Sequence, residues 1–149
     1  MALSISTALL DAIRDAARAA GACECCGLLV GDVAGIVTSI IPADNVSPTP
    51  ENRFEIDPAL LLRAYRAARQ GGPAIIGHYH SHPGGDPVPS STDAAMAERR
   101  GEIWLIVGRD GVVRAWRAGP TGALHGCFDA VEIIDLAQDR LAPASPDRH

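Results

Sequence analysis

The sequence predicts one α/β domain of the α+β type, in which a mixed β-sheet is flanked by two to three helices. Its 149 residues are the length of one domain and are enough to build a core without cross-links. Hydrophobic residues make up 47% of the chain and charged residues 21%, which is typical of a soluble globular protein. Short apolar runs alternate with amphipathic segments, and this mixture favours a mixed sheet with helices on its faces.

The N-terminal part begins with an amphipathic helix over residues 6–20, where apolar side chains recur at helical spacing and a glycine follows. Two strands are expected next, at 27–30 and 36–41, across a turn that contains glycine. Residues 42–52 are rich in proline, asparagine and serine and are expected to form a loop. A short strand is expected at 53–56.

A second helix is expected to begin at Asp57 and Pro58, because aspartate is a common N-cap and proline suits the first helical position. The sequence Gln-Gly-Gly-Pro at 70–73 ends this helix. A buried strand starts at Ile75 and stops before Pro83, since proline cannot donate to a strand ladder and holds the residue before it in an extended conformation.

The C-terminal part is expected to add three strands. They cover 103–107 and 112–117 and lie within 124–134. The Asp110-Gly111 pair between the first two predicts a hairpin turn. A short helix is expected over 135–141, which completes a domain of residues 1–141, and residues 142–149 are expected to form a flexible tail.

Composition and charge exclude several classes of protein. The net charge of −5 and the lack of a basic stretch argue against a nucleic-acid partner. The N-terminus lacks a basic region and reaches Asp11 early, so it does not predict a signal peptide. No apolar run approaches the roughly 20 residues that span a membrane. We therefore expect a cytoplasmic protein with no membrane partner and with reduced cysteines.

The stretch from Ile75 to Ala97 carries the candidate site. His80 and His82 are two apart at the end of the expected strand, so their side chains point to the same face and can present two imidazoles to one ion. Ser90 is a plausible N-cap of the helix that follows, and Asp93 then lies at its third position.

The helix formers that follow Asp93 predict that this helix continues to Arg100. A short Gly/Pro loop can fold the carboxylate of Asp93 back toward His80 and His82. Two histidines and one carboxylate with a fourth position left for water form a catalytic zinc set, because a structural zinc site fills all four positions with protein ligands.

Each half of this pattern also has an ordinary structural interpretation. A pair such as His80 and His82 is often just a polar strand end, and Ser90 with Asp93 fits a simple capping box. His78 shares the face of the other two histidines and offers a rival three-histidine set. Because His78 lies deeper in the apolar run, we favour a core histidine that is hydrogen-bonded to backbone. The conjunction of both halves in one short stretch favours the metal site.

Cysteines and carboxylates elsewhere are less informative. Cys23 and Cys26 form a lone C-x-x-C, whereas a zinc ribbon needs a second pair and a thioredoxin-like motif should open a helix. We expect Cys25 and Cys26 to be small buried side chains. Spacing alone does not distinguish Glu24 from the other glutamates.

The sequence from His80 to Asp93 resembles the JAMM motif, also called MPN+, in which H-x-H-P is followed after six residues by S-x-x-D. The agreement is complete at five positions: His80, His82, Pro83, Ser90 and Asp93. The family's second characteristic is a glutamate at the start of a strand with the pattern E-x-x-G-x-L. The segment from Glu24 to Leu29, E-C-C-G-L-L, resembles this pattern. Residues 52–58 resemble the middle of the short bacterial members, so the likeness covers roughly 24–116.

The resemblance implies a zinc peptidase with a cytidine-deaminase-like fold. His80, His82 and Asp93 would bind zinc, and a water would take the fourth position. Glu24 would be the general base that takes the proton of the attacking water, and Ser90 would hydrogen-bond the developing oxyanion. Zinc deaminases share the broad fold but use H-x-E with P-C-x-x-C, and this sequence contains neither.

Family substrates are amide bonds after the C-terminal Gly-Gly of ubiquitin or its relatives. For a short member, the resemblance implies a ubiquitin-like sulfur-carrier protein as the partner, cleaved at a peptide or an isopeptide bond. Two alternatives remain open: a non-catalytic, zinc-stabilised module that binds a ubiquitin-like partner, and a RadC-like JAMM protein. The sequence does not predict the oligomeric state.

Overall fold

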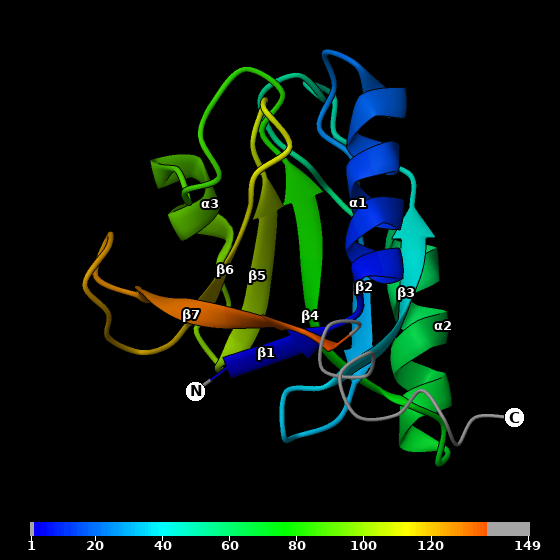
Figure 1. Ribbon diagram of the computed structural model, residues 1–149. Helices are drawn as coiled ribbons and strands as arrows, with labels where there is room; N and C mark the ends of the chain where they lie inside the picture. The colour runs from blue at the N-terminus through cyan, green and yellow to red at the C-terminus, as the bar shows by residue number, and fades with distance from the viewer. Residues whose placement is uncertain (1, 137–149) are drawn as a thin grey trace, which may run out of the picture.

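Seven strands and three helices form the framework of the protein in the computed structural model, which describes residues 2–136. The strands are β1 (Ala2–Ile5), β2 (Cys26–Gly31), β3 (Val37–Ala43), β4 (Ala74–Ser81), β5 (Glu102–Val107), β6 (Val113–Ala118) and β7 (Phe128–Asp135). They form one mixed sheet in the order β1-β7-β6-β5-β4-β2-β3 (Figure 1). The pairs β4–β5 and β1–β7 are parallel, and the other pairs are antiparallel.

The helices are α1 (Thr7–Ala20), α2 (Pro58–Arg69) and α3 (Ser91–Met96). The side chain of Ser6 caps α1 by accepting a hydrogen bond from the backbone N–H of Leu9. The side chain of Asp57 caps α2 by accepting the backbone N–H of Ala59, and Pro58 lies in the first turn of this helix. Within residues 2–136, every helix is too short or too polar to cross a lipid bilayer.

The sheet curls so that its two ends approach each other. A parallel bridge joins Ser4, in β1, to Ile36, directly before β3, although these strands stand at opposite ends of the strand order. The curl follows from the right-handed twist of strands, which accumulates across a sheet of this width. The centre of the sheet is the parallel pair β4 and β5, whose C-terminal ends therefore lie at the same edge.

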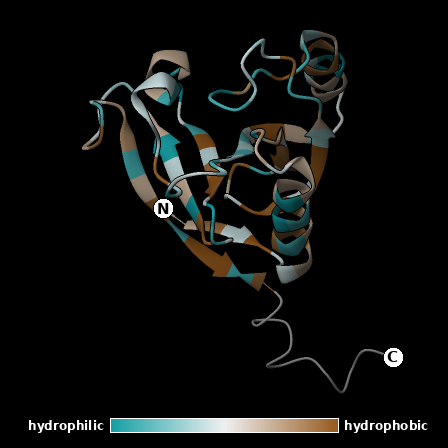
Figure 2. Ribbon diagram, turned by 90° about the horizontal axis from the view of Figure 1, so that it is seen from above, coloured by the Kyte–Doolittle hydropathy of each residue, from teal (hydrophilic) through white to brown (hydrophobic). Residues whose placement is uncertain are grey.

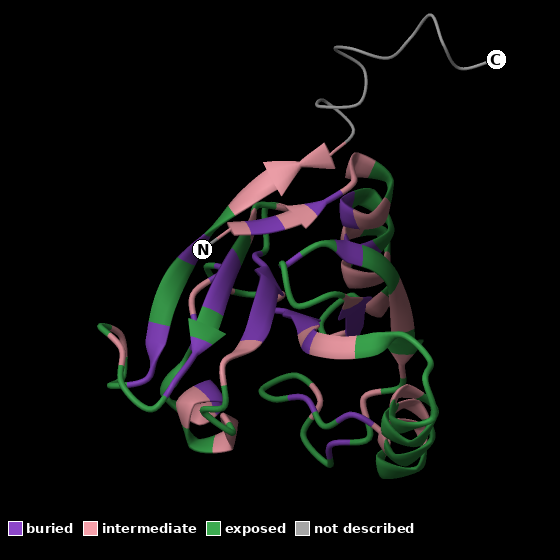
Figure 3. Cartoon of the chain, turned by 90° about the horizontal axis from the view of Figure 1, so that it is seen from below, coloured by how far each residue is buried: buried purple, intermediate pink, exposed green. Residues whose placement is uncertain are grey.

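Each face of the sheet carries its own hydrophobic core, because successive strand residues point to opposite faces. On one face, Leu10 and Ile13 of α1 pack with a cluster that includes Tyr79 and Leu105. On the other face, α2 and α3 pack with a cluster centred on Trp104. Hydrophobic residues follow the strands while the helices carry many hydrophilic ones (Figure 2), and buried residues run along the central strands (Figure 3).

The fold class predicted from the sequence is confirmed, including the helix that begins after Ser6 and the helix that begins after Asp57. The strand over Ala2–Ile5 was not expected. Its four residues bury Leu3 and Ile5 completely, but they run directly into a helix pattern, and the partner strand β7 lies at the other end of the sequence.

Three further expectations need comment. The strand expected at 53–56 is wrong, since this segment makes only an isolated bridge between Asn45 and Ile56. The helix expected to reach Arg100 ends at Met96, because Ala97 is extended. The helix expected over 135–141 and the tail lie outside the described residues, apart from residues 135 and 136, and Asp135 is the last residue of β7.

Candidate metal centre

The two histidines of the H-x-H pair lie where β4 ends. His80 is in the ladder, opposite Cys26 of β2 and Ile106 of β5, and it is fully buried. His82 lies one residue past the strand, and its backbone N–H still donates to the carbonyl of Val107 at 2.8 Å. Pro83 then prevents the ladder from continuing. Both imidazoles therefore stand at the C-terminal edge of the parallel pair, on the face covered by α2 and α3.

A backbone carbonyl sets the tautomer of His82. Its Nδ1 lies 2.8 Å from the carbonyl oxygen of Asp86. Because a carbonyl oxygen only accepts, Nδ1 carries a proton, so Nε2 is the nitrogen whose lone pair a metal ion would use. Metal-binding histidines are commonly oriented in this way.

Asp93 reaches the histidines from the first turn of α3. Ser90 and Asp93 form a reciprocal capping box: the Ser90 hydroxyl oxygen accepts the backbone N–H of Asp93 at 3.0 Å, and Oδ2 of Asp93 accepts the backbone N–H of Ser90 at 2.9 Å. The cap fixes the position of the carboxylate. Asp93 therefore forms the expected capping box with Ser90 and also lies next to the histidines, as expected.

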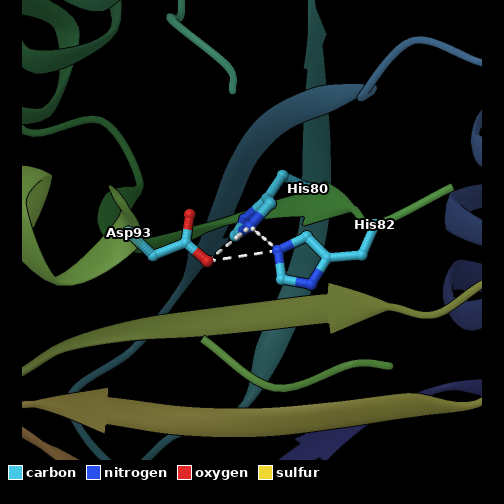
Figure 4. Close-up of side chains that lie close together, drawn as sticks. All are labelled: His80, His82 and Asp93. Carbon is cyan, nitrogen blue, oxygen red and sulfur yellow. Dashed lines mark hydrogen bonds and ion pairs between the residues drawn. The ribbon is translucent and has the colours of Figure 1, made fainter. Parts of the chain in front are cut away.

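Three donor atoms converge at this point (Figure 4). The Nε2 atoms of His80 and His82 are 3.1 Å apart, and Oδ2 of Asp93 lies 3.1 Å from Nε2 of His82 and 3.5 Å from Nε2 of His80. Four ligands at about 2.0–2.1 Å around zinc are separated by roughly 3.3 Å from one another, so the spacing fits a tetrahedral ion. A cation bound between these three atoms would also offset the repulsion between lone pairs that lie this close together.

The charge state of Asp93 suits the same conclusion. Burial by itself raises the pKa of this carboxyl, but hydrogen bonds from His80 and His82 and from the backbone of Ser90 outweigh burial and hold the pKa well below its ordinary value. Asp93 is therefore ionised at neutral pH, as a metal ligand must be. Among residues 2–136, His80, His82 and Asp93 form the group of ligand side chains that can hold a metal ion.

Glu24 lies beside this group, two residues before β2 begins. Its backbone N–H donates to the carbonyl of Pro50, and its carbonyl accepts from Asn45, so the backbone is held on both sides. The side chain is 7% exposed, and Oε1 is buried without a hydrogen-bond partner among residues 2–136. Burial raises the pKa of Glu24 to about 7, while the nearby His82 lowers it and Asp93 raises it further.

The strand register explains why Glu24 meets the histidines. Cys26 pairs with His80, and the ladder is extended beyond it where the backbone N–H of Cys25 donates to the hydroxyl of Ser81 at 2.8 Å. Glu24 therefore follows directly beyond the end of the β2–β4 pair. Spacing in the sequence could not identify this glutamate, because the register of two strands about fifty residues apart brings it to the site.

Two residues that the sequence did not single out fix the loop between His82 and Ser90. The indole Nε1 of Trp116 donates to the carbonyl of Pro87 at 3.0 Å, and Nε2 of His125 lies 3.0 Å from the carbonyl of Pro89. Both residues are distant from this loop in the sequence: Trp116 lies in β6, and His125 lies in the segment before β7. No local pattern could have revealed these contacts.

His78 does not join the ligand group. Its ring packs against Phe54 and Trp104, with centroid distances of 5.3 Å and 4.3 Å. His78 is half-buried and lines a cavity, so the expected core position is only partly correct. The expected hydrogen bond to backbone is not made by Nδ1, which is buried without a partner among residues 2–136. Burial lowers the pKa of His78 to about 3, so the ring is neutral.

The cysteines take no part in the ligand group. All four are free, and Cys26 is 2% exposed. Burial raises the pKa of Cys26 to about 12, which makes its thiol a poor nucleophile and a poor metal ligand. The prediction of a small buried side chain is confirmed for Cys26, whereas Cys25 is only half-buried and packs against the core.

A cavity of about 670 Å³ lies on the same face of the sheet; His78 lines it, whereas His80, His82 and Asp93 do not. Phe54, His78 and Trp104 form the wall that it shares with the site, and Tyr65 of α2 and Met96 of α3 line its sides. Most of its lining is apolar, with glutamates and Arg53 among the lining residues.

Comparison with known proteins gives related proteins over most of this chain. It is 38% identical over 118 residues to a protein of Haloferax volcanii named desampylase, a match that covers 76% of this chain and 85% of the relative. It is 40% identical over 76 residues to a Thermus thermophilus protein named as a probable TtuB-protein conjugate cleaving protease. That second match covers 51% of either chain, so this chain spans about half the length of that relative.

Solved structures share the fold. The solution structure of a Desulfitobacterium hafniense protein matches 89% of this chain and 91% of its own, with a TM-score of 0.75 and 28% identity. A structure described as a JAMM metalloprotease-like zinc site shares the fold at a TM-score of 0.53 and 19% identity, over 91% of this chain and all of its own. The family model for prokaryotic homologs of the JAB domain matches residues 6–119. The chain therefore belongs to the Prok-JAB family, the prokaryotic branch of the JAB (JAMM/MPN) domains.

Proposed function

We propose that this protein is a zinc-dependent peptidase or isopeptidase that hydrolyses the amide bond after the C-terminal Gly-Gly of a ubiquitin-like or sulfur-carrier protein. The observation that carries the proposal is the convergence of three ligand atoms beside a buried carboxylate whose pKa is near 7. The names of the two relatives support the class of reaction, because one is a desampylase and the other cleaves protein conjugates.

His80, His82 and Asp93 would hold the zinc through two Nε2 atoms and one carboxylate oxygen. Three protein ligands leave one position free, which is the mark of a catalytic site. A zinc ion held there supplies Lewis acidity, which polarises a carbonyl and makes water a nucleophile near neutral pH. The fixed tautomer of His82 and the capped position of Asp93 orient two of the three ligands before the ion arrives.

Glu24 acts as the general base and then as the general acid. Burial raises the pKa of this carboxyl to about 7, so it can take a proton from the attacking water and later return it to the leaving amine. Its Oε1 is buried and has no partner within the described part of the chain, so it can accept this proton without first breaking a hydrogen bond there. Such proton transfer contributes roughly a hundredfold or more to the rate.

Ser90 stabilises the oxyanion. Its hydroxyl oxygen already accepts the N–H of Asp93, which fixes the side chain and leaves the hydroxyl hydrogen free to donate. The side chain is exposed, so the donor faces the solvent side from which a substrate enters. A donor aimed at the developing charge is worth about 3–4 kcal/mol in related acyl-transfer reactions.

The cavity beside His78 would take the residues that precede the scissile bond. A Gly-Gly terminus lacks side chains and so can pass close to the ligands, while larger residues further back would occupy the apolar space between α2 and α3. We also infer that the protein acts in the cytoplasm, since its four cysteines are free and such thiols persist in a reducing compartment.

The test uses purified protein and a fluorogenic or gel-resolved conjugate in which a ubiquitin-like carrier is joined through its Gly-Gly terminus to a lysine side chain or to a peptide. We expect about one zinc per chain and cleavage after the second glycine, identified by mass spectrometry. Glu24→Gln is the matched control, because it should keep the zinc and lose the activity. Zinc-loaded protein that binds such carriers but leaves all the conjugates intact would show a binding module.

A further inference from the structure

The two candidate histidine ligands differ in what holds the ring nitrogen that faces away from the metal. Nδ1 of His82 donates to the carbonyl of Asp86. Nδ1 of His80 is buried and has no hydrogen-bond partner among residues 2–136. Metal-binding histidines almost always donate this second N–H to a carboxylate, a carbonyl or a water, and the partner sets the orientation of the ring. Something else must therefore orient His80.

Aromatic rings surround His80 on two sides. Phe54 stacks on it, with ring centroids 4.3 Å apart and an angle of 22° between the planes. Trp104 meets it edge to face at 5.6 Å and 83°. His80 is 0%, Trp104 1% and Phe54 5% exposed, so the three rings form a closely packed unit that excludes water. A ring held in this way cannot rotate without displacing a neighbour.

Trp104 is itself anchored. Its indole Nε1 donates to Oε2 of Glu102 at 3.4 Å. The same carboxylate accepts the backbone N–H groups of Glu98 at 2.8 Å and of Arg100 at 2.8 Å. Burial raises the pKa of Glu102, but these hydrogen bonds outweigh it and lower the pKa below its ordinary value, so the acceptor is charged.

We propose that packing rather than hydrogen bonding orients the metal ligand His80: Phe54 and Trp104 clamp its imidazole, and Glu102 fixes Trp104 through its indole N–H. These three are positioning residues, and the proposal rests on the metal site inferred above. Glu102 also binds the segment that leaves α3, the helix that carries Asp93. The carboxylate of Glu102 thus contacts both Trp104, which packs on His80 of β4, and the backbone that follows α3, the helix of Asp93.

The test compares Phe54→Leu with Phe128→Leu. Phe128 is 0% exposed and packs edge to face on Trp104 at 5.2 Å, in the same cluster, but it makes no ring contact with His80. Both changes remove a buried ring of the same size, so both should lower the thermal midpoint. Only Phe54→Leu removes the stack on His80. Phe54→Tyr keeps that ring and should keep the metal-site properties of the original protein.

Two measurements report the metal site without any substrate. The first is zinc affinity by competition with a chromophoric chelator, and the second is the visible absorption spectrum of the Co²⁺-loaded protein, which depends on ligand geometry. We expect Phe54→Leu to weaken zinc binding about tenfold, as loss of an orienting partner does elsewhere, and to change the Co²⁺ spectrum. Phe128→Leu and Phe54→Tyr should keep the spectrum and stay within about twofold in affinity.

Glu102→Ala tests the anchor. It should alter the Co²⁺ spectrum in the same sense as Phe54→Leu, whereas Glu102→Gln, which keeps an acceptor oxygen, should restore part of the affinity. If Phe54→Leu does not fold, Phe54→Met replaces it, since methionine keeps the volume without the ring.

An unchanged spectrum and affinity in Phe54→Leu or Phe54→Met would overturn the proposal, as would an equal loss in Phe128→Leu. These outcomes do not depend on cleavage: a zinc-loaded protein that is inert on conjugates refutes the proposed function and leaves the clamp intact.

Discussion

Glu24→Gln should have two opposite effects, because the buried carboxyl that would act as the proposed base also costs the fold stability. The carboxylate is 7% exposed, its Oε1 has no partner among residues 2–136, and its pKa rises from 4.5 to about 7. A shift of this size corresponds to about 3 kcal/mol against the charged form, and we take about 1–2 kcal/mol after allowing for screening by solvent. Glutamine has a similar shape and carries no charge.

The sign follows from linkage. Since the folded pKa of Glu24 is above its unfolded value, the original protein loses stability relative to Glu24→Gln as the pH rises from 4.5 through 7. The metal-free variant should therefore be more stable by about 1–2 kcal/mol at pH 8, or about 2–8 °C in thermal midpoint. At pH 5 about a quarter of this difference should remain.

The assay is thermal unfolding of both proteins in a chelator at pH 5 and pH 8, beside turnover and zinc content of the loaded proteins. Turnover should fall about a hundredfold or more while zinc content stays the same. A variant that is less stable than the original at pH 8, or a gain that does not grow between the two pH values, would show that the buried carboxylate is not strained. A variant that keeps its turnover would remove Glu24 from the mechanism.

Three further predictions concern other parts of the molecule. Asp93→Asn should weaken zinc binding by at least about a hundredfold, measured by chelator competition, because it removes the ligand charge; unchanged affinity would mean that the carboxylate is not a ligand. Gly27→Ala should cost about 1–3 kcal/mol in urea unfolding, since its Cβ would meet the ring of Tyr79 at 2.3–2.4 Å. Cys23→Ser should leave both zinc content and turnover unchanged in the same assays, and loss of either would assign this thiol a role at the site.

The residues of the candidate metal site could be located from the sequence because they lie in one continuous stretch in which each local signal is strong. Pro83 sets the end of β4, so His80 and His82 had to fall at a strand end. Ser90 and Asp93 match a capping box, so their helix had to start where it does. Neither signal depends on a partner from elsewhere in the chain.

The supports of the site could not be predicted, because each depends on a contact between distant segments. Phe54 lies in a segment that looked like a strand, yet its ring stacks on His80. The helix formers after Asp93 favour a longer helix, but the carboxylate of Glu102 binds the backbone N–H groups that such a helix would use. Tertiary contacts overrode propensity at this position.

The short length of α3 links metal binding to the order of this region. A helix of six residues is not stable alone, so α3 depends on its capping box, on Glu102 at its exit and on the loop that Trp116 holds at Pro87. The strand that carries the histidines has no such weakness, since β4 pairs on both sides. A metal ion that draws Asp93 to the histidines therefore adds its binding energy to the least stable of the elements that build the site.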